Sequence, residues 1–247
     1  MILLIDTSQE TGTTALCNGA EVLFSEENKI AKESASWLHP AISRMLSEAG
    51  ITVRDLKAVA VVAGPGSYTG LRVGMAAAKG FCYALKIPLI TQNTLRVMAE
   101  SVIPFAIEKQ ALICPMIDAR RDEVFTALFK LNAESGTHKA EISAVNRQPS
   151  TVNRQPSTIE LIDIKPPQAL ILDKTAFETE LTDDRIIFFG SGAEKWKKIT
   201  ESSHALFQPQ PNLIQAFAKL AHADFEAQNW ADPVYAEPVY LKEFFSY

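Results

Sequence analysis

A glycine-rich turn, GPGS at residues 64–67, is the segment of this chain whose residue types are best suited to chemistry. The valine-rich residues 56–63 before it predict a buried strand, and residues 69–85 after it predict a helix. A turn of this kind presents free backbone N–H groups and the positive end of a helix dipole, which can bind phosphate. The turn matches neither GxxxxGK nor GxGxxG, so a tight connection without a ligand remains the alternative interpretation.

Two aspartates end apolar stretches that predict strands. Asp6 follows residues 2–5 and Asp118 follows residues 112–117, and a second glycine turn, residues 190–192, follows the predicted strand 185–189. If both strand ends face one cleft, the side chains and turns that would contact a nucleotide or phosphate are Asp6, Ser8, Gly66, Ser67, Asp118 and Gly192. The alternative is that these residues only form strand-end turns and a helix cap.

The histidines and cysteines predict neither a metal site nor a hydrolytic nucleophile. His39 stands on the first long predicted helix, where Ala35 and Ser43 occupy the positions four before and four after it, and neither side chain binds metal. No Ser or Cys stands at a workable spacing from a histidine. The three cysteines are scattered, as is usual for buried thiols in a reducing compartment. We therefore expect no metal and no tightly bound cofactor.

Composition limits the classes of partner. The chain has 247 residues, 47% of them hydrophobic, and a formal net charge of −5. No stretch approaches the ~20 apolar residues of a membrane span, so we expect a cytoplasmic protein without membrane contact. The acidic balance gives no general attraction for nucleic acid, so we expect any RNA to be held only through a complex.

The order of predicted elements divides the chain into two lobes of similar plan. In residues 1–105, a strand, a hairpin around Asn18-Gly19 and an amphipathic helix precede the glycine turn, its helix, a strand and a helix capped by Asn93. Residues 106–247 repeat the order of strand, hairpin, strand, glycine turn and helix, and a helix near residues 211–229 could complete the first lobe. The expected fold class is α/β, with a mixed sheet and helices in each lobe.

A tandem duplication interrupts the second lobe. The sequence VNRQPST occupies residues 145–151 and again 152–158. Its polar, proline-bearing composition predicts an exposed loop, and its role is left open.

The helix after the glycine turn has an unusual small-residue stripe, formed by Gly70, Gly74 and Ala78 at intervals of four. An interior glycine costs roughly 1 kcal/mol relative to alanine, so close packing must offset this cost. The neighbour that packs there is either the chain's own sheet or another subunit.

Five segments resemble the TsaB family of bacterial accessory subunits in tRNA threonylcarbamoyladenosine synthesis. They are MILLIDTS, GPGSYTGLRVGMAAAKGFCYALKIPL, IDARRDEVF, FFGSGAEKW and EPVYLK, and together they extend over nearly the whole chain. The resemblance implies a two-lobed actin-like ATPase (ASKHA) fold. It further implies a subunit that is not itself an enzyme and that binds TsaD. With the ATPase TsaE, TsaD transfers a threonylcarbamoyl group to the tRNA adenosine beside the anticodon, and these partners supply ATP and metal chemistry.

The resemblance also implies an interface in which the first-lobe helices pair with TsaD or with a second copy in a homodimer. Transferred to this sequence, it assigns the interface to Leu38, Ile42, Met45, Gly70, Gly74, Ala77 and Ala78. The chain departs from the family near Ser34, where members often carry a histidine, and at the tandem duplication.

Two other classes of function remain as alternatives. An autonomous nucleotide-dependent enzyme, a kinase or ATPase, would use Asp6 and Asp118 in a complete cleft, and a glycopeptidase-like protein would need a metal pair or an activated nucleophile. A direct tRNA-binding module would need a basic stripe with stacking aromatics, which the sequence does not show.

Overall fold

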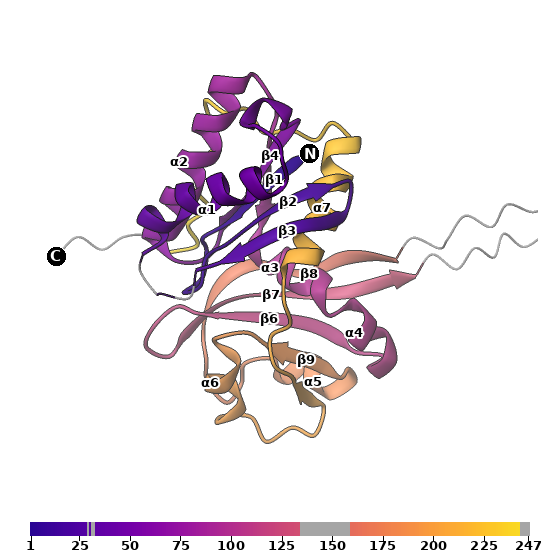
Figure 1. Ribbon diagram of the computed structural model, residues 1–247. Helices are drawn as coiled ribbons and strands as arrows, with labels where there is room; N and C mark the ends of the chain where they lie inside the picture. Colours follow the sequence, from indigo (N-terminus) through magenta and orange to yellow (C-terminus); the bar gives the residue numbers. More distant parts are fainter. Residues whose placement is uncertain (29, 31–32, 134–158, 243–247) are drawn as a thin grey trace, which may run out of the picture.

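A computed structural model of the chain describes residues 1–28, 30, 33–133 and 159–242, and contains two five-stranded sheets that lie one above the other in Figure 1. The duplicated VNRQPST segment, residues 145–158, lies outside the described residues.

The first sheet has β1 at its centre, with the order β3-β2-β1-β4-β5. Strands β1 and β2 are antiparallel, as are β2 and β3, whereas β4 and β5 run parallel to β1. The strand bounds are β1 Ile2–Asp6, β2 Thr13–Asn18, β3 Glu21–Glu27, β4 Ala58–Gly64 and β5 Leu89–Asn93. The hairpin predicted around Asn18-Gly19 is confirmed, with Gly19 at φ +60°.

The second sheet repeats this topology around β6, with the order β10-β9-β6-β7-β8. Strand β7 is antiparallel to β6 and to β8, and β9 and β10 run parallel to β6. The bounds are β6 Leu112–Asp118, β7 Glu123–Ala133, β8 Ile159–Ile171, β9 Ile186–Phe189 and β10 Ala205–Phe207. Two sheets with one topology confirm the predicted two-lobed actin-like fold.

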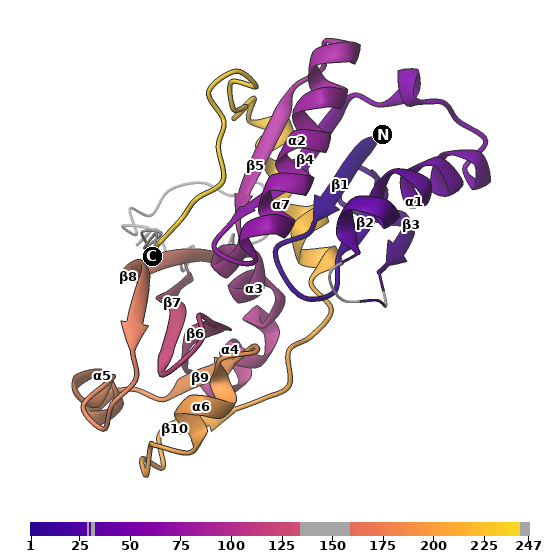
Figure 2. The same ribbon diagram turned by 90° about the vertical axis from the view of Figure 1, so that its left-hand side faces the viewer.

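Helices cover both faces of the first sheet (Figure 2). Helices α1 (Ser34–Glu48) and α2 (Tyr68–Leu85) pack on one face, and α7 (Ile214–Glu226) packs on the other. A short 3₁₀ helix, η1 (Val53–Asp55), precedes β4. Helix α7 thus completes the first lobe although it follows the second in the sequence.

Helices α3 (Thr94–Ser101) and α4 (Ile103–Lys109) pack on the inner face of the second sheet, and α5 (Glu178–Asp183) and α6 (Ala193–Lys197) pack on its outer face. Helix α3 also places Val97 in the core of the first sheet, so it joins the two lobes. Its predicted cap is confirmed, because the Asn93 side chain accepts hydrogen bonds from the backbone of Leu95 and Arg96.

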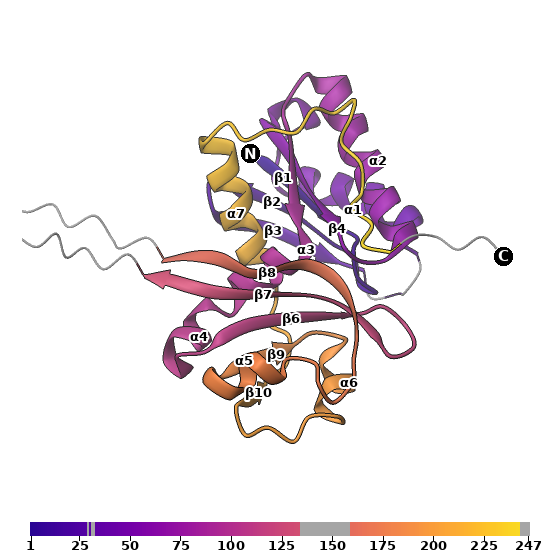
Figure 3. The same cartoon turned by 180° about the vertical axis from the view of Figure 1, so that it is seen from behind.

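After α7 the chain runs back beside α2, as Figure 3 shows. The Ala231 N–H donates to the Leu89 carbonyl (2.8 Å), and the Val239 N–H donates to the Ala63 carbonyl (2.7 Å). Helix α7 thus packs on the first lobe, as the prediction for residues 211–229 allowed, and so do residues 231–240 of the tail, which the predicted boundary assigned to the second lobe.

The structure contradicts the residue assignment of the predicted interface. All seven residues are buried within the chain's own core or against its own backbone: Leu38, Ile42, Met45, Gly70, Gly74, Ala77 and Ala78. The apolar stripes of α1 and α2 face the chain's own sheet, because that is where burial removes most apolar surface from water. These side chains are not available to a partner.

Candidate functional site

The glycine turn packs directly on the end of β1. A Cβ added at Gly66 would lie 2.2 Å from the Ser8 carbonyl oxygen, and one added at Gly70 would lie 1.9 Å from the Thr7 carbonyl oxygen. The Ser67 N–H donates to Ser8 O (2.7 Å), and the Thr7 hydroxyl donates to Gly70 O (2.7 Å). The chain's own backbone therefore fills the space beside this turn, and one of the N–H groups expected to bind phosphate is already used.

The C-terminal tail closes the turn from another side. Gly64 has φ +120°, and a Cβ there would lie 2.6 Å from the Val239 carbonyl oxygen. One residue further on, the Tyr240 ring packs on Tyr68 with centroids 5.2 Å apart, and its hydroxyl accepts a hydrogen bond from Arg72 Nε (3.1 Å). The turn is thus enclosed by two segments of the same chain.

The Asp6 side chain stabilises the turn that follows β1. Its Oδ1 accepts hydrogen bonds from the Ser8 N–H (2.9 Å) and the Ser8 hydroxyl (2.6 Å). Burial raises the pKa of Asp6 above its ordinary value, and the hydrogen bonds from Ser8 offset only part of that effect. The predicted residues Asp6, Ser8, Gly66 and Ser67 therefore lie together, joined by a strand-end turn.

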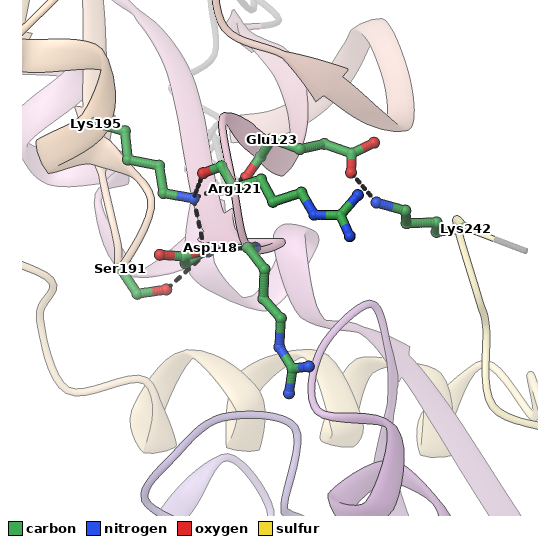
Figure 4. A network of polar contacts seen from close by, with 7 residues as sticks. Asp118, Arg121, Glu123, Ser191, Lys195 and Lys242 are labelled. Atoms are coloured by element: carbon green, nitrogen blue, oxygen red, sulfur yellow. Dashed lines mark hydrogen bonds and ion pairs between the residues drawn. The ribbon is translucent and has the colours of Figure 1, made fainter. Parts of the chain in front are cut away.

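Asp118 occupies the corresponding place in the second lobe (Figure 4). Its Oδ1 accepts hydrogen bonds from the Arg120 N–H (2.6 Å) and from Lys195 Nζ (2.7 Å). Partial burial acts to raise the pKa of Asp118, but these two hydrogen bonds and the nearby positive charge outweigh it, so the pKa lies below its ordinary value. Asp118 is an ionised group with a fixed cationic partner.

The second glycine turn also packs on a strand end. A Cβ added at Gly190 would lie 2.4 Å from the Met116 carbonyl oxygen, which accepts a hydrogen bond from the Gly192 N–H (3.0 Å). The Ser191 hydroxyl accepts from the Asp118 N–H (3.0 Å). The predicted residues Asp118 and Gly192 therefore lie together, in a cluster held by contacts separate from those of the first lobe.

The hairpin between β6 and β7 contains an arginine pair that the sequence reasoning missed. Arg120 and Arg121 are exposed and have φ of +69° and +53°. A residue with a Cβ costs roughly 1–2 kcal/mol in this left-handed region. Lys195 Nζ holds the hairpin by also donating to the carbonyls of Arg121 (2.6 Å) and Glu123 (3.2 Å), as Figure 4 shows.

The same hairpin receives the end of the C-terminal tail, because Lys242 forms an ion pair with Glu123. The sequence carried little signal for these contacts, since Lys195 and Lys242 lie far along the chain from the hairpin. The absence of Asn or Gly between two strands was the one available sign that its turn is unusual.

The remaining candidate features lie elsewhere. A cavity of about 340 Å³ lies on the outer face of the second lobe, walled by residues of α5, α6 and the segments beside them, and no predicted site residue lines it. Within the described ranges, no cluster of three or more His, Cys, Asp and Glu is arranged to hold a metal ion. The same residues contain no helix long and apolar enough to cross a membrane.

The cysteines lie in the core. All three are buried, and burial raises the pKa of Cys17 and Cys114 to about 12. Their thiols are therefore unreactive at neutral pH.

The geometry defines a two-lobed actin-like protein whose glycine turns are packed on its own strand ends. The chain belongs to the family described as TsaD, tRNA N6-adenosine threonylcarbamoyltransferase, whose family model matches residues 24–230. Within that family it is similar to proteins named TsaB, which confirms the resemblance found in the sequence.

The tRNA threonylcarbamoyladenosine biosynthesis protein TsaB of Bacillus subtilis is 34% identical over 52% of this chain and 55% of its own length. The protein of the same name from Escherichia coli is 31% identical over 58% of this chain and 61% of its own length. The chain thus aligns with little more than half the length of these two relatives. The Haemophilus influenzae TsaB is 25% identical over 98% of this chain and 93% of its own length.

The solved structure of YeaZ from Pseudomonas aeruginosa covers 97% of this chain and 99% of its own, with a TM-score of 0.69 and 22% identity. Another structure from that organism, described as similar to peptidase YEAZ, covers 98% of this chain and 99% of its own, with a TM-score of 0.74 and 22% identity. At this identity the two structures support the fold alone.

Proposed function

We propose that the chain is a non-catalytic accessory subunit in tRNA threonylcarbamoyladenosine biosynthesis. In this proposal it binds TsaD and acts with TsaE, while TsaD transfers the threonylcarbamoyl group to the adenosine beside the tRNA anticodon. The names of its curated relatives support the pathway.

The main observation that supports a non-catalytic role is that the chain's own backbone occupies the space beside the glycine turn. In a nucleotide-binding turn, the N–H groups at the helix start must face an open space. Here the Ser8 carbonyl accepts the Ser67 N–H, and the Thr7 and Ser8 backbone lies within van der Waals contact of Gly66 and Gly70. Phosphate binding at this turn would require the segment after β1 to move away, which disfavours the autonomous kinase or ATPase.

The two strand-end aspartates support the same proposal. Asp6 accepts hydrogen bonds from Ser8, and Asp118 accepts hydrogen bonds from Lys195 and from the Arg120 N–H. Each therefore has a structural role in a turn, so neither is needed as a catalytic carboxylate. We propose that ATP and metal chemistry is supplied by the partners.

The surface proposed for TsaD, or for a second copy, is the outer side of α1 and α2. The two helices adjoin there, with the rings of His39 and Phe81 5.8 Å apart. On α2, Gly80 has no neighbour within 4 Å of an added Cβ, and Tyr83 is 74% exposed. Small residues beside an exposed aromatic allow another helix to approach closely and bury apolar area.

The pathway is tested by reconstitution with purified TsaD, TsaE, ATP, threonylcarbamoyl adenylate and tRNA. The chain alone should transfer no threonylcarbamoyl group and hydrolyse ATP negligibly, and its addition to TsaD and TsaE should restore modification. Robust ATP turnover that co-purifies with this chain alone would favour the autonomous enzyme instead.

The surface is tested with Gly80→Leu, which adds a side chain where the isolated chain has open space. The variant should melt at or above the wild-type temperature and lose TsaD binding in analytical ultracentrifugation. Lys197→Leu, at an exposed position of α6 in the other lobe, is the matched control and should bind normally. Normal TsaD binding by both variants would place the interface elsewhere.

A further inference from the structure

The arginine pair at the β6–β7 hairpin stands where its backbone is least favourable. Arg120 and Arg121 both have positive φ, at positions where tight hairpins normally use Asn and Gly. Both side chains are exposed, so core packing does not require them. Strained residues that the surrounding structure holds in place concentrate at functional sites, which points to a use for the guanidinium groups themselves.

The neighbouring carboxylates are largely neutralised by other cations. Asp118 pairs with Lys195, and Glu123 pairs with Lys242. Asp122 is the remaining acidic residue of the hairpin and follows the two arginines in the sequence, and among the described residues neither arginine forms an ion pair. The tip of the hairpin is therefore net positive, in a chain whose overall net charge is −5.

The tertiary structure brings the C-terminal tail to this hairpin. The tail reaches the hairpin at Lys242, whose ammonium pairs with Glu123, as Figure 4 shows. Two residues before Lys242, the Tyr240 hydroxyl contacts Arg72 of α2. The end of the tail thus contacts both Arg72 of α2 and the hairpin that carries Arg120 and Arg121.

We infer that this surface, formed by Arg72, Arg120 and Arg121, contacts the phosphodiester backbone of RNA. Arginines bind phosphate oxygens through paired N–H groups. A protruding, exposed hairpin cannot enclose a small anion, but it can lie along a chain of phosphates. That the RNA is tRNA rests on the proposed function, whereas the presence of a phosphate-binding surface does not.

The experiment measures tRNA binding by fluorescence anisotropy over a range of salt concentrations, for the full chain alone and for its complex with TsaD. The test variant combines Arg120→Asn with Arg121→Gly, which removes both charges and suits the backbone. The logarithm of the binding constant falls linearly with the logarithm of the salt concentration, and each lost phosphate contact reduces the steepness of this fall by about 0.7–0.9. The steepness should therefore be smaller by roughly 1.4–1.8 in the double variant. The melting temperature should not fall, because the new residues relieve strain.

Two further variants separate charge from structure. Arg120→Lys with Arg121→Lys keeps both charges and both Cβ atoms, and should keep most of the salt dependence. Arg54→Asn removes an exposed arginine in η1, before β4 and so at the opposite end of that strand from the glycine turn, and should bind like wild type.

An unchanged slope in the folded Asn-Gly variant would overturn the inference, as would an equal loss in the Arg54→Asn control. If the Asn-Gly variant binds ATP more weakly than wild type but binds tRNA normally, the surface binds small phosphates and the RNA assignment is wrong. Failure of the wild-type chain to bind TsaD or to support modification would count against the proposed function, while the binding assay on the chain alone would still decide the RNA contact.

Discussion

Glycine-to-alanine substitutions in α2 should change stability in opposite directions at two positions of the same helix. At Gly70 an added methyl group would lie 1.9 Å from the Thr7 carbonyl oxygen, a backbone atom that cannot rotate away. At Gly80 the same methyl group has no neighbour within 4 Å. Because one helix contains both sites, the pair separates packing from intrinsic helix propensity.

The expected magnitudes follow from these contacts. Overpacking costs typically 1–3 kcal/mol, and movement of Thr7 also puts at risk its hydrogen bond to Gly70 O, worth about 1 kcal/mol. Alanine is more favourable than glycine inside a helix by up to about 1 kcal/mol, which offsets part of this cost. Gly70→Ala should therefore lose about 1–3 kcal/mol, and Gly80→Ala should gain up to about 1 kcal/mol.

Thermal melting followed by circular dichroism measures both effects. For a chain of this size, 1 kcal/mol shifts the melting temperature by roughly 2–4 °C. Gly70→Ala should thus melt about 2–12 °C below wild type, and Gly80→Ala up to about 4 °C above it. An unchanged or higher melting temperature for Gly70→Ala would refute the direct packing of α2 on the end of β1.

Three other substitutions test the strand-end turns and the helix stripe. Asp6→Asn keeps an oxygen acceptor and removes a carboxylate whose raised pKa makes the stability of the wild type fall as pH rises above about 3.8. The stability of the variant relative to wild type, measured by urea unfolding, should therefore increase as pH rises from that value. Lys195→Met should lose about 1–2 kcal/mol at neutral pH, because it leaves Asp118 without its cation. Since the lowered pKa of Asp118 gives stability that is lost as pH falls below its ordinary value of 3.8, the Lys195→Met deficit should shrink in acid. Gly74→Leu should fail to fold or melt well below wild type, because its Cβ would lie 2.4 Å from the Thr7 hydroxyl; normal stability and normal TsaD binding would contradict this packing.

Local chemistry in the sequence was enough to predict the elements. The Asn18-Gly19 turn, the Asn93 cap and the valine-rich strand before the glycine turn depend on residues within a few positions of one another, and the structure contains all three. The repeated order of these elements was also enough to predict two lobes of one topology.

The neighbours of those elements were decided only by the tertiary structure. The stripe of Gly70 and Gly74 indicated close packing, but spacing along a helix does not say which residue approaches. It is Thr7, through its carbonyl at Gly70 and its hydroxyl at Gly74. Likewise Lys195 and Lys242 reach the hairpin after Asp118 only because α6 and the tail fold back to it. Charge and packing act through space, so a sequence that is acidic overall can still form a basic surface, and a stripe suited to a partner can be used by the chain itself.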